Sequence, residues 1–263
     1  MPAAIEFRNV HFAHGKRAIF DDMSFCIEER EMTALVGPNG VGKTTLLKIV
    51  AGLLRPTSGT VLLQGRALES WSRRELSCYA ALVPQHLDVP FAFRVDEIVA
   101  QGRVPHLRRF AGPSARDLEV VESAIKAVDI LDLRERAYSD LSGGERQRVK
   151  IAIGLAQQPK VMMLDEPTQH LDLGRQIELM GLLRTLNQSG ITIVAAMHDL
   201  ALVRENFSSV ILLMPEAVSI AGPTAEVLRP ELLERAFLVD RSSLGRHVSA
   251  ESFTYERGNR YER

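Results

Sequence analysis

The chain has 263 residues, of which 46% are hydrophobic and 25% are charged, as in an ordinary globular protein with a sizeable core. This length fits one large domain or a core domain with an inserted subdomain. The net charge of −1, from 32 basic and 33 acidic residues, excludes a general electrostatic attraction to nucleic acid or to anionic lipid.

The first third of the chain predicts short strands separated by turns. Runs of β-branched, aromatic and other apolar residues at strand length predict strands at 4–12, 23–29, 32–37, 58–65 and 79–84. The segment at 58–65 is expected in a hairpin and the segment at 79–84 in the core. A helix is predicted at 43–53, and its end is marked by Gly52 and then Pro56.

From about residue 87 to 158 the pattern becomes helical. Helical spacing is found at 95–102, 114–131 and 143–157, with no strand pattern between these segments. We therefore expect an inserted all-helical subdomain. Alternation then resumes with predicted strands at 160–167, 191–198 and 209–214 separated by helices, one of them at 173–188, and this order predicts parallel βαβ units. The polar tail at 246–263 is interpreted as a disordered end or a small regulatory extension.

The segment "GPNGVGKTT" at 37–45 matches G-x-x-x-x-G-K-[ST] and lies between a predicted strand and a predicted helix, which is the context of a P-loop. Backbone N–H groups of such a loop and the following helix N-terminus bind phosphate. Lys43 is expected to reach the β- and γ-phosphates, Thr44 to bind Mg²⁺ and Thr45 to support the α-phosphate side. The predicted ATP-binding residues here are Gly37, Pro38, Asn39, Gly40, Val41, Gly42, Lys43, Thr44 and Thr45.

The segment "KVMMLDEP" at 160–167 supplies two carboxylates at the end of an apolar strand. In α/β sheets ligands bind at the carboxyl ends of the strands, so both side chains are expected at the nucleotide. Asp165 is predicted to hold Mg²⁺ through water. Glu166 is predicted to be the general base that polarises the attacking water.

Four further motifs complete an ordered set. They are Gln85 in "VPQ", "LSGGERQ" at 141–147, "QHLD" at 169–172 and His198 in "AAMHDL". Together with the P-loop and the Asp165–Glu166 pair they resemble, in type and order, the motifs of ABC-type ATPases, and the resemblance covers about residues 4–240. It implies an α/β fold over 1–245, with a P-loop NTPase core of the ABC type, an antiparallel β subdomain and an inserted all-helical subdomain at about 87–158.

The resemblance also implies roles for these motifs. Two copies of the chain are expected to pack head to tail, so that the P-loop of one copy faces the signature residues of the other, which are Ser142, Gly143, Gly144 and Glu145. Gln85 is expected to contact Mg²⁺ and the attacking water, His198 to sense the γ-phosphate and Asp172 to make contact across the dimer. Simpler alternatives stay open: Gln85 as a surface amide, His198 as a helix N-terminal residue and Asp172 as a helix cap.

Two positions depart from the pattern of that family. His14 occupies the place of the aromatic residue, commonly tyrosine, that stacks on adenine, and imidazole offers a smaller stacking area. We expect His14 to contact the adenine. Gln169 stands where a serine usually begins the motif at 169–172, which puts the fine coupling between the two sites in question.

The segments 95–107 and 221–237 resemble ATPases of bacterial importers for iron chelates, haem and cobalamin. This resemblance implies a separate integral-membrane permease and, indirectly, a periplasmic or surface substrate-binding protein. The apolar residues Val89, Phe91, Ala92, Phe93 and Val95, with Arg103, Arg108 and Arg109 beyond them, suggest a groove with a basic rim for a short permease helix. Alternatively, the apolar residues form the core of the helical subdomain and the arginines a solvated face.

The remaining features favour a cytoplasmic location. The two cysteines, Cys26 and Cys78, have no metal-ligand spacing and fit a reducing compartment. No signal peptide is expected at the N-terminus, and apolar runs such as 191–197 are far below the roughly 18 residues needed to span a bilayer. The chain is therefore predicted at the cytoplasmic face of the inner (cell) membrane, held there by the permease.

Other classes were weighed against transport. A soluble ABC ATPase without a permease, for example in repair or cofactor assembly, remains an alternative. An importer ATPase for an oxyanion such as molybdate is another, because the segment "PFAF" at 90–93 resembles one found in some oxyanion importers. A P-loop kinase or GTPase is excluded by the signature motif. No nucleic-acid partner is expected, because the charge is balanced.

Overall fold

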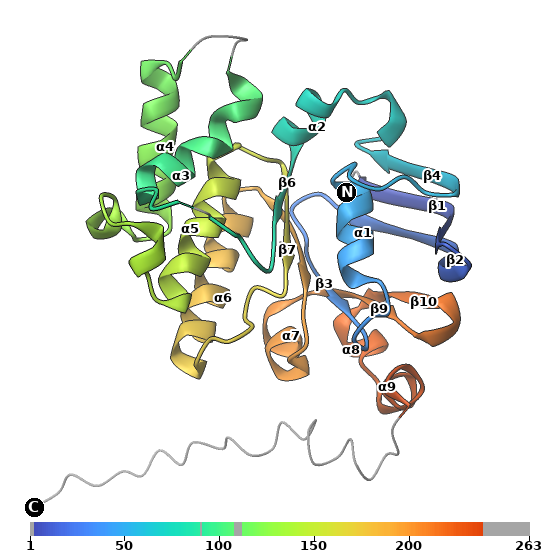
Figure 1. Cartoon of the computed structure of the whole chain (residues 1–263). Helices are drawn as coiled ribbons and strands as arrows, with labels where there is room; N and C mark the ends of the chain where they lie inside the picture. Colours follow the sequence, from blue (N-terminus) through green and yellow to red (C-terminus); the bar gives the residue numbers. More distant parts are fainter. Residues whose placement is uncertain (1–2, 90, 108–111, 239–263) are drawn as a thin grey trace, which may run out of the picture.

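The computed structural model describes residues 3–89, 91–107 and 112–238, and it contains two β-sheets and a set of helices (Figure 1). The tail predicted at 246–263 and the two arginines Arg108 and Arg109 lie outside the described residues. Within the described part of the chain, no helix is long and apolar enough to cross a membrane.

The first sheet has four antiparallel strands in the order β2-β1-β4-β5. Its strands are β1 (Ala3–His14), β2 (Arg17–Glu28), β4 (Ser58–Leu63) and β5 (Arg66–Ala67). The strands predicted at 4–12, 23–29 and 58–65 are confirmed, although β2 begins six residues before the predicted start. It begins earlier because the turn that joins β1 to β2 is short and contains Gly15 at φ 62°.

The second sheet has six strands in the order β10-β9-β3-β8-β7-β6. All neighbours are parallel except β10, which runs antiparallel to β9. The strands are β3 (Met32–Val36), β6 (Ala80–Val83), β7 (Val161–Asp165), β8 (Thr192–Ala196), β9 (Ser209–Leu213) and β10 (Ser219–Pro223). Strands β3, β7 and β8 are buried along their whole length, as expected for parallel strands covered on both faces. The predicted parallel strands are confirmed.

Helix α1 (Lys43–Val50) lies between the two sheets (Figure 1). Its buried residues Leu46, Leu47 and Ile49 share one core with both sheets. The opposite face of the six-stranded sheet packs in a second core with residues of the later helices. These helices are α5 (Gly143–Ala156), α6 (Leu173–Gln188), α7 (Leu200–Asn206), α8 (Thr224–Val227) and α9 (Pro230–Phe237).

Between β6 and β7 the described residues form helices and turns. They are α3 (Val95–Ala100), α4 (Ala115–Ala127), α5 and the 3-10 helices η2 (Gln101–His106), η3 (Leu131–Leu133) and η4 (Tyr138–Asp140). Helices α3, α4 and α5 contact one another. Two further 3-10 helices lie elsewhere, at η1 (Leu68–Ser70) and η5 (Pro215–Ala217). Whether these helices form a subdomain with the predicted bounds stays a prediction.

Arg103 does not lie on a basic rim, so the expectation for this residue is wrong. Its side chain is only 4% exposed, and the guanidinium donates to Asp117 Oδ1 at 2.9 Å, Ala156 O at 2.7 Å and Gln158 Oε1 at 3.0 Å. These contacts join η2 to the start of α4 and the end of α5. A buried arginine needs such partners, and here they make it a structural residue.

The apolar residues after Gln85 divide between core and surface. Val95 is fully buried in the helical core, as the simpler alternative proposed. Phe91 and Phe93 are 71% and 41% exposed, and their rings meet edge to face with centroids 6.0 Å apart. An exposed aromatic pair remains as the apolar part of the predicted docking surface.

Helix α2 (Arg73–Tyr79) was not predicted. It begins with a capping box, in which Ser72 and Glu75 each accept the backbone N–H of the other. Arg74 reaches from α2 to the end of η2 and donates to the carbonyl oxygens of Pro105, His106 and Leu107 at 2.7–3.1 Å. Helix α2 is therefore tied to the helices that follow it in the chain.

Candidate active site

The predicted site residues follow neighbouring strands of the six-stranded sheet. The P-loop follows β3, Gln85 follows β6, Asp165 and Glu166 end β7, and His198 follows β8. These strands are parallel, so their carboxyl ends meet at one edge of the sheet. The topology therefore brings together side chains that are up to about 160 residues apart in the chain.

Three glycines set the backbone conformation of the P-loop, and two of them pack closely against neighbouring strands. Gly37, Gly40 and Gly42 have φ values of 153°, 72° and 120°, which side chains with a Cβ rarely adopt. A Cβ at Gly42 would lie 2.6 Å from Ile19 Cγ2, and one at Gly37 would lie 2.4 Å from the Leu213 carbonyl oxygen. The loop is thus pressed between β2 and the end of β9.

The N-terminus of α1 is suited to an anion. Its N-cap is Gly42, which has no side chain to cap the helix, and no acidic residue lies in the first turn. The first N–H groups of such a helix point along the axis toward the loop and carry the positive end of the helix dipole. The predicted phosphate-binding arrangement is therefore compatible with the backbone.

Lys43 is buried inside the loop and donates to the carbonyl oxygens of Gly37 at 2.8 Å and Pro38 at 3.3 Å. Burial lowers the pKa of the Lys43 ammonium, while the charges of Glu166 and Asp165 oppose that shift. A phosphate bound in the loop can therefore compete with these oxygen atoms for the desolvated Lys43 ammonium.

Asp165 is the best candidate for holding a divalent cation. Burial raises the pKa of the Asp165 carboxyl, a hydrogen bond with Thr44 opposes this rise, and the charge of Glu166 adds to it. Its Oδ1 is buried and has no hydrogen-bond partner among the described residues. Buried carboxylate oxygens normally have partners, and carboxylate and hydroxyl oxygens are ligands that Mg²⁺ prefers. Asp165 and Thr44 therefore fit Mg²⁺.

Glu166 lies at the centre of a side-chain network. Its Oε2 accepts from Gln85 Nε2 at 2.9 Å, and its Oε1 lies 2.5 Å from His198 Nε2. Gln85 Nε2 also donates to Gln169 Oε1. The backbone of Glu166 has φ 50°, in the left-handed region, which is uncommon for residues other than glycine and concentrates at functional sites.

One pocket joins this network to the P-loop. Glu166 lines it together with Ile19 and the loop residues Asn39, Gly40, Gly42, Lys43, Thr44 and Thr45. Ile19 was missed in the sequence, because it lies in β2 and belongs to no motif. His14 is exposed at the end of β1, opposite Arg17, and is not among the residues that line the pocket. Its contact with adenine stays a prediction.

The signature residues form the start of α5. Ser142 Oγ accepts from the Glu145 N–H at 3.4 Å, and Glu145 Oε2 accepts from the Ser142 N–H at 2.7 Å. Hydrogen bonds to the Glu145 carboxyl from the side chain and the backbone N–H of Ser142 lower the pKa of that carboxyl. None of the four signature residues lines the P-loop pocket of the same described chain. Their contact with ATP stays a prediction for a second copy.

Asp172 caps helix α6. Its Oδ1 accepts from the Arg175 N–H at 3.0 Å, so the simpler alternative describes a contact that the side chain makes. The predicted contact across a dimer is compatible with this role, since a capping carboxylate has further lone pairs.

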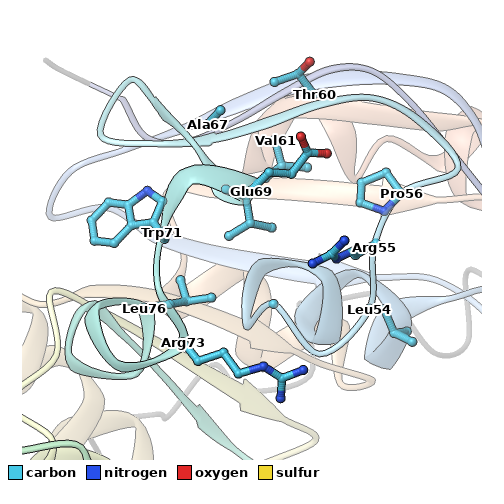
Figure 2. A pocket seen from close by; sticks show the side chains of 12 residues that line it. Leu54, Arg55, Pro56, Thr60, Val61, Ala67, Glu69, Trp71, Arg73 and Leu76 are labelled. Atoms are coloured by element: carbon cyan, nitrogen blue, oxygen red, sulfur yellow. The ribbon is translucent and has the colours of Figure 1, made fainter.

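A second hollow lies away from these residues, between the end of α1, β4 and α2 (Figure 2). Trp71, Arg55 and Leu76 line it, and none of the predicted site residues does. The predicted nucleotide site therefore lies at the P-loop, away from this hollow.

Comparison with known proteins relates the chain to one family. The model of the family described as ABC transporter matches residues 20–169. The hemin import ATP-binding protein HmuV of Gloeobacter violaceus is 42% identical over 79% of this chain and 77% of that protein. The iron(3+)-hydroxamate import ATP-binding protein FhuC of Bacillus subtilis is 36% identical over 86% of this chain and 85% of that protein.

Solved structures agree with this relation. A protein described as a metal-chelate type ABC transporter in an inward-facing conformation superposes with a TM-score of 0.81 at 30% sequence identity, over 90% of each chain. The structure of cbiO1 from Clostridium perfringens superposes with a TM-score of 0.77 at 29% identity, over 94% of this chain and 98% of that one.

Proposed function

The chain belongs to the ABC transporter family, and we propose that it drives uptake of an iron chelate or haem through a separate permease by hydrolysing ATP in a head-to-tail dimer. Its relatives are ATP-binding subunits of importers, and the chain is an ATPase of that kind. The observation that carries the chemical part is the position of Glu166, which lines the P-loop pocket and bonds to Gln85 and lies within hydrogen-bond distance of His198.

In the proposed reaction, the P-loop N–H groups and Lys43 bind the phosphates of ATP. Asp165 and Thr44 would hold Mg²⁺ with Gln85, and the ion would neutralise charge on the phosphate oxygens. Glu166 takes a proton from the attacking water, and Gln85 and His198 orient its carboxylate through their hydrogen bonds. His14 is retained as the adenine contact, a proposal that rests on its place in the β1–β2 hairpin.

The separation of the motifs supports the proposed dimer. Within one described chain the start of α5 does not reach the P-loop pocket, so Ser142, Gly143, Gly144 and Glu145 are free to meet ATP bound by another copy. Closure is favoured because both copies contact the γ-phosphate only in the closed state. Asp172, at the start of α6, is proposed to touch the partner copy.

The cargo and the permease are proposed from the relatives. Proteins named for import of hemin, hydroxamate-bound iron and ferric enterobactin are 35–42% identical to this chain. The permease contact is proposed at the exposed pair Phe91 and Phe93, which follows Gln85 in the chain and can sense its movement. The chain would thus sit at the cytoplasmic face of the cell membrane, with a surface or periplasmic binding protein delivering the cargo.

A pull-down from detergent-solubilised membranes of the source cell tests this function. We expect a multi-span permease in near-equal amount with the wild-type chain, and its loss with Phe91→Ser. Leu118→Ser, which removes an apolar side chain of similar exposure on α4, is the matched control and should keep the permease. Soluble partners only would favour a non-transport ATPase, and a permease for an oxyanion would overturn the cargo.

A further inference from the structure

We propose that Gln169 is a positioning residue: its side-chain oxygen fixes the amide of Gln85 in the orientation that presents Gln85 Oε1 to Mg²⁺. This inference rests on the proposed function of the site, and it assigns a task to the glutamine that stands where a serine usually begins the motif at 169–172.

The orientation follows from the donors of one amide group. Gln85 Nε2 donates to Glu166 Oε2 at 2.9 Å and to Gln169 Oε1. An amide nitrogen carries two hydrogens, so these two bonds use both of them. A flipped amide would instead place Gln85 Oε1 against a carboxylate oxygen and a second carbonyl oxygen. The Glu166 carboxylate has no hydrogen to donate and so excludes the flipped form, while Gln169 accepts the second hydrogen and restricts rotation of the amide.

This orientation determines where the amide oxygen of Gln85 lies. Gln85 Oε1 is bonded to the same carbon as Nε2 and points away from both acceptors. Among the described residues no hydrogen bond to Oε1 is found. The backbone at this place is also fixed, because Lys150 Nζ donates to the carbonyl oxygens of Pro84 at 3.3 Å and Gln85 at 2.6 Å. Side-chain rotation is then the main freedom left to Gln85, and Gln169 restricts it.

The loop that carries Gln169 is itself held in place. The Gln169 N–H donates to the Glu166 carbonyl at 3.2 Å, and the Leu171 N–H donates to the Thr168 carbonyl at 3.3 Å. Gln176 Nε2, from helix α6, donates to the Leu171 carbonyl at 3.2 Å. Gln169 therefore lies in a turn that is held in place, and the hydrogen bond that it accepts from Gln85 links that turn to the end of β6.

The length and charge of the side chain fit this task. A serine in this position would end two bonds short of the atom that accepts from Gln85. A glutamate would keep an acceptor oxygen but would bring a second negative charge close to Glu166. Glutamine is the side chain of this length that offers a neutral acceptor.

The test compares Gln169→Leu, which keeps the approximate size and removes the acceptor, with the wild-type full-length chain. In ¹⁵N-edited spectra recorded without nucleotide, one side-chain amide hydrogen of Gln85 should move upfield in this variant. In ATPase assays the Mg²⁺ concentration for half-maximal rate should rise about fivefold, the effect of losing roughly one hydrogen bond, while the rate at saturating Mg²⁺ changes little. Gln169→Glu should restore the downfield amide hydrogen.

Two further variants separate positioning from general loosening of the loop. Gln101→Leu, on η2, is the control and should leave the Mg²⁺ dependence unchanged. In a Gln85→Ala background, Gln169→Leu should have no additional effect, because Gln169 acts through Gln85. Three outcomes would overturn this inference while leaving the proposed function intact: an additive effect of the two substitutions, an unmoved Gln85 amide signal, or an unchanged Mg²⁺ requirement. A wild-type chain that hydrolyses no ATP would overturn the proposed function and the inference with it.

Discussion

At the scale of single residues, the chemistry converges on one carboxylate. One carboxylate oxygen of Glu166 accepts a hydrogen bond from Gln85, and the other lies within hydrogen-bond distance of His198. Glu166 also lines the same pocket as the P-loop residue Lys43. Its left-handed backbone costs on the order of 1 kcal/mol or more, which the surrounding contacts must offset. The left-handed backbone of Glu166 agrees with the proposed chemical task.

Glu166→Gln tests that task. Because an amide cannot take a proton from water, we expect phosphate release to fall at least about 100-fold while ATP affinity changes little. Phosphate release and nucleotide binding are measured on the same preparation. Glu205→Gln, an exposed carboxylate on α7, is the control and should keep full turnover. Normal turnover in Glu166→Gln would remove this residue as the general base.

The residues in motifs could be predicted, and the contacts between motifs could not. Lys43, Asp165 and Glu166 are predictable because their motifs fix the local chemistry and because the ends of parallel strands carry ligands. The bond between Gln85 and Gln169 joins two loops that are 84 residues apart, and the sequence contains no signal for it. Ile19 lines the pocket only because β2 passes beside the loop, which depends on the whole sheet.

At the scale of elements, buried Arg103 fastens η2 to α4 through an ion pair with Asp117 and to α5 through a hydrogen bond to the Ala156 carbonyl. Asp117 serves twice: it completes the capping box with Ser114 at the start of α4, and it accepts from Arg103. These contacts, the hydrogen bonds with Ser114 first, lower the pKa of the Asp117 carboxyl to about 2. The folded chain therefore holds this carboxylate ionised where an unfolded chain would begin to bind a proton.

A pH series of urea unfolding tests this pair with Asp117→Asn. Since the folded pKa is lowered, the contribution of Asp117 is present above about pH 4 and is lost as the pH falls toward 2. The variant should be less stable by about 3 kcal/mol near neutral pH, and the difference should shrink as the pH drops from 4. Asp132→Asn, at an exposed position on η3, is the control. A difference that does not vary with pH would contradict this account.

Elements with strong periodicity or a complete motif were predicted well. The predicted strands other than β2, which begins six residues early, and the helices at 43–53, 143–157 and 173–188 are found within a few residues of their expected bounds, while the short strand β5 was not predicted. Helix α2 was missed although Ser72 and Glu75 have capping-box spacing, because the segment is short and polar. The error at Arg103 has a physical cause: a charged side chain is buried only when a partner is present, and the partner lies 14 residues away on another helix.

At the scale of the whole molecule, the proposed function requires a second copy to complete the site. The start of α5 presents Ser142, Gly143 and Gly144 without contact to the P-loop pocket of its own described chain. A nucleotide bound at the P-loop would therefore be covered from one side only in a single chain. The oligomeric state of the protein in the presence of ATP therefore tests whether a second copy covers the bound nucleotide.

Ser142→Arg, placed in the Glu166→Gln background, tests the shared site. The added guanidinium should block closure without touching the P-loop, so the double variant should bind ATP as a monomer while Glu166→Gln alone gives an ATP-dependent dimer. Size-exclusion chromatography with light scattering measures this. Ser123→Arg, on the exposed face of α4, is the control and should still dimerise. Loss of ATP binding in monomeric Ser142→Arg would contradict a contact made in the partner.

The order of the strands in the six-stranded sheet could not be predicted from the sequence. Alternating strands and helices predicted parallel neighbours, but not that β3 would lie between β8 and β9. Such pairings join segments more than 150 residues apart and are decided by the packing of all helices together. The predicted class of fold was therefore sound, while its internal arrangement had to be observed.

The central place of β3 also bears on protein synthesis. A nascent chain that has left the ribosome up to residue 190 already contains the P-loop and both carboxylates of 165–166, yet it lacks the two strands that flank β3. The carbonyl that packs against Gly37 belongs to Leu213 and emerges later still. Contacts so distant in sequence form late and slowly. A chain released early by the ribosome would contain all residues of the phosphate-binding motif but not the strands that pack around it. Nucleotide binding can therefore stabilise only the complete, folded chain.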